Sequence, residues 1–152
     1  MSELRLVDAQ KIVTLTLQHR TTAGGKPLAV AVLDSAGHLK ALAREDGASM
    51  FRTDIAVGKA WGAVAVGAPS RMIAQVAQQN PSFVGALAVA SSGKIIPNPG
   101  GVLIRDPSGK IIGAVGVSGD VADRDEAFAI EGITAAGLVA DPAAPAPSEA
   151  KR

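Results

Sequence analysis

The chain has 152 residues, of which 47% are hydrophobic and 19% are charged, so it fits one well-packed domain. A net charge of +1, an aromatic content of 3% and the lack of a basic stripe give no basis for nucleic-acid binding. The absence of cysteine excludes disulfides and thiolate chemistry, and the lack of an N-terminal apolar block or a long apolar run predicts a cytoplasmic protein without membrane contact.

The first predicted helix spans residues 6–22, where apolar residues recur at helical spacing, and Gly24-Gly25 ends it. His19 lies near the edge of the apolar stripe. It can be a half-buried histidine that favours the negative end of the helix dipole. The functional alternative is an axial ligand to haem iron.

Two strands joined by a short turn follow this helix. Residues 28–34 are apolar on both faces, which predicts a central strand, and residues 39–45 form its partner. His38 lies in the turn and is expected to be solvated. Arg44 emerges at the far end of the second strand, where it can pair with Asp46 or anchor the carboxylate of a ligand.

The second predicted helix, residues 50–66, carries a lysine among small apolar residues. Lys59 shares one side of the helix with Ala56, Ala60 and Ala63. Its ammonium can reach solvent along the side chain. Alternatively, it serves a buried anion or transfers a proton at a lowered pKa.

The sequence predicts a third helix at residues 71–79 and short strands at 86–90 and 94–96. The last residues, 141–152, are rich in proline and alanine and are expected to be disordered. The folded domain is therefore expected to span residues 1–140.

A hairpin leading into a helix dominates the C-terminal half. Gly100-Gly101 forms a bend, residues 102–105 and 110–117 form strands, and Asp106-Pro107-Ser108-Gly109 forms the turn between them. The final helix is expected from Asp123 to about Ala140. Strands joined by short turns imply an antiparallel sheet in an α+β fold.

Three acids, Asp123, Asp125 and Glu126, stand at the start of that final helix. They suit capping of the helix and its positive dipole end. A metal-binding or general-base role is the alternative.

Five segments occur in an order typical of one family: GGKPLAVAVLDSAGHL (24–39), REDGAS (44–49), DIAVGKAW (54–61), PGGVLIRD (99–106) and GAVGVSGDVADRDEAFAIEG (113–132). Over residues 4–139 the chain resembles the GlcG/HbpS-like haem-binding proteins, also described as haem-degrading domains and related to the C-terminal part of PduO-type proteins. This resemblance implies a profilin-like α+β fold, with an antiparallel five-stranded sheet flanked by helices. It also implies homo-oligomers, from dimers to octamers.

The resemblance also implies ligands and site residues. Haem or a related tetrapyrrole is the leading candidate, and His19 resembles the haem-ligating histidine of the PduO-type branch. The HbpS-type branch carries an acidic pair associated with iron. Here Asp54 matches the first acid, while Val57 stands at the second position, which argues against iron sensing.

Lys59, Gly100 and Gly101 match the family pattern. Together with Pro99 they are expected to line a ligand cleft, at a subunit interface.

Two further functions compete with haem binding. One is a cofactor-independent enzyme that acts on a small carboxylate in a catabolic (glycolate, propanediol or aromatic) pathway, as family members occur in such operons. Arg44 or Lys59 would hold the carboxylate, while Asp125, Glu126 or Lys59 would move a proton. The other is a purely structural partner of another enzyme.

Overall fold

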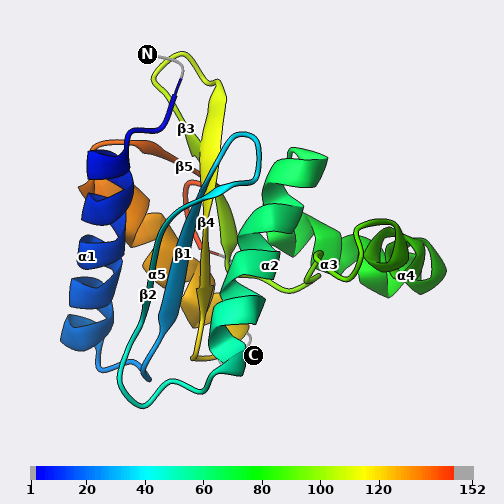
Figure 1. Ribbon diagram of the computed structural model, residues 1–152, viewed down its shortest axis with the longest axis horizontal. Coiled ribbons are helices and arrows are strands. Elements are labelled where there is room, and N and C mark those ends of the chain that lie inside the picture. The colour runs from blue at the N-terminus through cyan, green and yellow to red at the C-terminus, as the bar shows by residue number, and fades with distance from the viewer. Residues whose placement is uncertain (1–2, 146–152) are drawn as a thin grey trace.

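In the computed structural model, which describes residues 3–145, five helices pack around one antiparallel sheet (Figure 1). In chain order the elements are α1 (Leu6–Ala23), β1 (Ala29–Asp34), β2 (Leu39–Arg44), α2 (Phe51–Val66), α3 (Ser70–Gln79), α4 (Pro81–Ala90), β3 (Gly101–Arg105), β4 (Ile111–Ser118), α5 (Ala122–Ala135) and β5 (Val139–Asp141). The predicted five-stranded antiparallel α+β architecture is confirmed.

The strand order is β2-β1-β4-β3-β5. The central pair, β1 and β4, is in register from Ala29 opposite Ser118 to Asp34 opposite Gly113. Both strands are almost entirely buried, as their continuous apolar sequences predict.

Helices cover both faces of the sheet. On one face, α1 and α5 share the main core with the strands, through side chains such as Ile12, Ile133 and Val115. On the other face, α2 lies close to the strands because it presents small residues such as Ala56 and Ala60. Gly116 of β4 completes this contact, since a Cβ there would overlap the carbonyl oxygen of Ala56.

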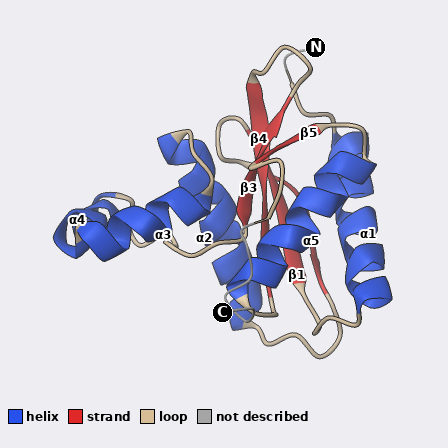
Figure 2. Cartoon of the chain, turned by 180° about the vertical axis from the view of Figure 1, so that it is seen from behind, coloured by secondary structure: helices blue, strands red, loops and turns tan. Residues whose placement is uncertain are grey.

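Helices α3 and α4 extend away from the sheet on the side of α2, and α4 lies farthest out in both views (Figures 1 and 2). The predicted strand at residues 86–90 is wrong, because these residues form the second half of α4. A continuous apolar run fits either element, and Asn80 decides in favour of a helix by accepting the Phe83 N–H, with Pro81 at the first helical position.

The C-terminal elements also differ from the prediction. Residues 94–96 form a loop, and α5 ends at Ala135 instead of about Ala140. Gly137, with φ of 83°, turns the chain into β5. Asp141, assigned to the tail by the sequence, pairs with Leu103 in the sheet. The predicted disorder of residues 146–152 lies outside the described residues.

Within the described residues, no helix combines the length and apolar character that crossing a membrane requires.

Candidate functional site

A closed polar cluster lies where α2, α5 and the end of β4 meet. Lys59 of α2 and Asp125 of α5 are each 1% exposed. The Lys59 Nζ donates to Asp125 Oδ2 at 3.2 Å and to the Val117 carbonyl at 2.9 Å. Asp125 Oδ1 accepts the Asp120 backbone N–H at 2.9 Å, which ties the turn after β4 to the start of α5.

The two glycines of the predicted cleft pack against this lysine. A Cβ at Gly100, where φ is 127°, would lie 2.9 Å from Lys59 Nζ. A Cβ at Gly101 would overlap the Lys59 carbonyl oxygen, and the Gly101 N–H donates to Ser70 Oγ at 2.7 Å. In the single chain these glycines, buried beside the half-buried Pro99, form a tight contact and not the floor of an open cleft.

A second buried acid lies beside the first. Glu126 is fully buried, and its Oε2 lies 3.1 Å from Nε of Arg71 on α3. The structure therefore brings together the three predicted catalytic residues, Lys59, Asp125 and Glu126. All three side chains are closed to solvent, so none can contact a substrate in this conformation.

Burial is the main cause of the pKa shifts of both Lys59 and Asp125. Loss of solvent raises the pKa of Asp125 to about 6, against the opposing attraction of the Lys59 ammonium. The same loss of solvent lowers the pKa of Lys59, again against the attraction of its partner. Each group is thus easier to neutralise than in water.

Arg44 lies at the end of β2, away from these acids. Its guanidinium donates to the Ala48 carbonyl at 2.5 Å, where the sequence predicted a contact with Asp46. The residue is exposed, and its role in anchoring a carboxylate stays a prediction.

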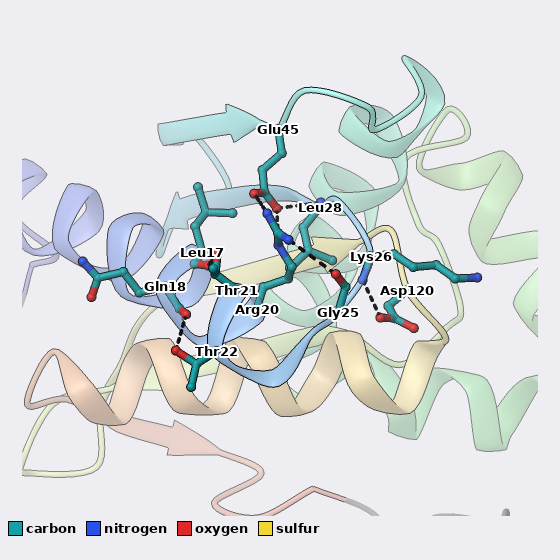
Figure 3. Close-up of polar contacts among 10 residues, drawn as sticks. All are labelled: Leu17, Gln18, Arg20, Thr21, Thr22, Gly25, Lys26, Leu28, Glu45 and Asp120. Carbon is teal, nitrogen blue, oxygen red and sulfur yellow. Dashed lines mark hydrogen bonds and ion pairs between the residues drawn. The ribbon is translucent and has the colours of Figure 1, made fainter.

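His19 stands on the last turns of α1, which polar contacts hold against the sheet (Figure 3). The Arg20 guanidinium pairs with the carboxylate of Glu45, which also accepts the Leu28 N–H at 2.9 Å. Arg20 Nη1 donates to the Gly25 carbonyl at 3.4 Å. The helix turn that carries His19 is therefore fixed in place.

A small hollow of about 220 Å³ lies between α1 and α5; this α1–α5 hollow is lined by His19, Ala23, Arg124, Ala127, Phe128 and Glu131. His19 Nε2 lies 3.2 Å from Glu131 Oε2, and the histidine side chain is 46% exposed. The Arg124 guanidinium lies over the Phe128 ring at 5.4 Å. An imidazole and a guanidinium thus share one surface hollow, and the Phe128 ring is buried beneath it at 4% exposure.

A larger hollow of about 760 Å³ follows the outer side of α2. This α2 groove runs between the β1–β2 turn and the loop before β3; its side chains include His38, Phe51, Asp54, Val57, Trp61 and Lys94. The Lys94 ammonium lies 5.3 Å from the centre of the Trp61 ring. The sequence assigned no ligand role to this group of residues, although 51, 54, 58 and 61 recur at helical spacing and could have been read as one face.

The fold is an α+β domain with hollows on its surface beside α2 and between α1 and α5. A family model for haem-degrading HbpS-like proteins matches residues 4–134, and the chain belongs to this family. A comparison with curated proteins gives no match.

Solved structures share this fold. A complex of PduOC with haem is 24% identical, with a TM-score of 0.80 over 90% of this chain and 96% of that one. The ORFY protein of Klebsiella pneumoniae is 25% identical, with a TM-score of 0.81 over 90% and 92%. HbpS itself is 26% identical, with a TM-score of 0.76 over 89% and 91%.

Proposed function

We propose that this protein binds haem in the α1–α5 hollow, with His19 as the iron ligand. Three groups in that hollow carry the proposal. The imidazole can ligate iron, the small side chains of Ala23 and Ala127 offer an apolar surface, and the Arg124 guanidinium can pair with a propionate. When bound, haem would supply a redox-active iron. The family match and the similarity to a haem complex point to the same ligand.

The size of the hollow sets how the ligand would lie. Clefts that enclose drug-sized ligands measure roughly 300–1,000 Å³. At about 220 Å³ the α1–α5 hollow is too small to enclose a tetrapyrrole. The residues of α1 and α5 in a single chain would therefore contact only part of the ring.

Titration of haem into the purified protein tests the proposal through the Soret band. We expect a shift in the wild-type protein, its loss in His19→Ala, and its retention in the matched control His38→Ala. No shift in the wild type overturns haem binding. A shift kept in His19→Ala but lost in His38→Ala overturns the role of His19 and moves the iron ligand to the α2 groove.

Helix α4 supports assembly into a homo-oligomer. No charged residue occurs between Arg71 and Lys94, and in α4 only Val84 is buried. Val89 is 82% exposed and Phe83 is 51% exposed. A helix that is apolar on all sides is normally covered, and a neutral surface is compatible with an identical copy of itself.

Light scattering can measure this assembly. We expect Val89→Glu to reduce the particle mass, because it places a charge in the apolar surface of α4. Val7→Glu, at a 58% exposed position on α1, should leave the mass unchanged. A monomeric wild-type protein, or equal behaviour of the two variants, would overturn α4 as the contact between subunits.

The predicted enzyme that acts on a small carboxylate has less support. Its proton-transfer residues, Lys59, Asp125 and Glu126, are buried and engaged with one another or with Arg71. A role of this protein in a catabolic pathway and its cytoplasmic location stay predictions.

A further inference from the structure

The α2 groove gathers much of the chain's aromatic surface. The chain has one tryptophan, three phenylalanines and no tyrosine, and Trp61 and Phe51 both line this groove. Phe51 is 64% exposed and Trp61 is partly buried, so both rings have surface available for contact. Ile96 of the opposite loop adds an apolar surface close to α2, where its N–H meets the Gly58 carbonyl at 3.4 Å. This combination suits a flat organic molecule.

Polar side chains of the groove are available to such a molecule. Within residues 3–145, the side chains of Asp54 and His38 form no hydrogen bond or ion pair, and the Lys94 ammonium interacts with the Trp61 ring but with no acid. The groove therefore offers an ammonium, a carboxylate and an imidazole at the edges of an apolar surface. At about 760 Å³ it falls within the size range of clefts that bind small organic ligands.

The mixture of charges narrows the class of ligand. The described residues contain no cluster of three or more side chains suited to a metal ion, and Val57 places an isopropyl group beside Asp54. A simple anion would gain from Lys94 but be repelled by Asp54. A molecule with an anionic end and a hydrogen-bond donor at the other end satisfies both side chains.

We propose that the α2 groove binds a small aromatic acid that carries a hydroxyl or amino group. Its ring packs on Trp61 and its carboxylate pairs with the neighbouring Lys94. Its donor points along α2 towards Asp54, which stands seven residues, or about two helical turns, before Trp61. His38 also lines the groove, and its imidazole can donate or accept a hydrogen bond. This site is separate from the α1–α5 hollow and shares no residue with it.

The probe is 4-hydroxybenzoate, titrated into the haem-free protein by calorimetry and by tryptophan emission. Trp61 is the only tryptophan, so its emission reports on this groove directly. We expect saturable binding with a change in emission. Absence of both heat and emission change at millimolar probe overturns the proposal, and it leaves the haem experiment unaffected because no haem is present.

Two variants test the assigned contacts. Lys94→Ala should weaken binding by roughly tenfold or more, as expected for a lost charge-assisted hydrogen bond. Lys110→Ala, which removes an exposed lysine from the β3–β4 turn, should bind as the wild type does. Asp54→Asn should reduce the preference for 4-hydroxybenzoate over benzoate. Equal affinity of Lys94→Ala and the wild type would overturn the contact between Lys94 and the carboxylate. An unchanged preference in Asp54→Asn would overturn the contact between Asp54 and the donor. Either result overturns the proposed class of ligand.

Discussion

The cluster around Lys59 and the α2 groove lie on different sides of the same helix. Charged side chains are buried and paired in the cluster, whereas in the groove they are accessible and, within the described residues, unpaired. Lys59 and Asp125 are each 1% exposed and bond to one another and to the backbone. Asp54, only five residues before Lys59, faces an open groove without a partner among residues 3–145. The first arrangement holds helices together, whereas the second is available to a ligand. The solvent exposure of a side chain is therefore a better guide to a ligand site than its residue type.

Removal of the buried ammonium should give the largest effect on stability. Lys59→Met leaves the Asp125 carboxylate buried beside an unbonded Val117 carbonyl, and we expect a loss of about 3–5 kcal/mol at pH 8. Urea unfolding measures this change. The double variant Lys59→Met/Asp125→Leu should recover much of the loss, because no charge then stays buried. Lys110→Met is the exposed control, and a comparable loss there would refute the importance of the buried pair.

The glycine bend that packs on Lys59 should give the next largest effect. Gly101→Ala places a Cβ on the Lys59 carbonyl, and the two backbones must separate, which costs about 1–3 kcal/mol. Gly85→Ala is the matched control on α4, where nothing within the described part of the single chain lies within 4 Å of the added Cβ. It should stabilise the helix by about 0.5–1 kcal/mol. Unfolding midpoints that move in the same direction for both variants would contradict the close contact.

The sequence predicts the body of the fold well because its strands and helices have strong periodic or apolar patterns. The strand at 28–34 and the hairpin at 102–117 were found by such patterns. The apolar run that forms α4 carries no periodicity, so it was mistaken for a strand. The proposed contact between subunits explains why α4 is apolar on all sides, because a second copy of the chain would cover it. The sequence of one chain does not show such a contact.

The site was predictable only in part. Small neighbours along α2 pointed to a buried Lys59, and the structure pairs it with the predicted Asp125. Arg71, the partner of Glu126, was not found, because nothing in the sequence relates α3 to the start of α5. The α2 groove was missed because Phe51 and Trp61 share a face with polar residues, and only the β1–β2 turn and the loop before β3 make that face a groove.

The pH dependence of stability separates the buried acid from exposed ones. Asp125 has a folded pKa of about 6 and an ordinary value of 3.8, so the folded chain binds its proton more tightly than the unfolded chain does. The contribution of Asp125 to the free energy of unfolding is therefore fully present below pH 4, and it falls as the pH rises towards 6. Relative to Asp125→Asn, the wild type should gain stability as the pH is lowered from 7 to 4.5. A difference between the two proteins that stays constant with pH would exclude this titration.

The exposed contact between His19 and Glu131 in the α1–α5 hollow should give the smallest effect, and it acts on haem binding instead of stability. His19 Nε2 lies 3.2 Å from Glu131 Oε2, and this nitrogen cannot hold an iron ion and the carboxylate at once. Exposed pairs contribute roughly 0.2–1 kcal/mol, so Glu131→Ala should tighten haem binding by at most about fivefold. Asp8→Ala removes the same charge from α1 outside the hollow and should leave the affinity unchanged. Weaker binding in Glu131→Ala would mean that the carboxylate orients the imidazole instead of competing with iron, because an orienting partner raises the basicity of a ligating histidine.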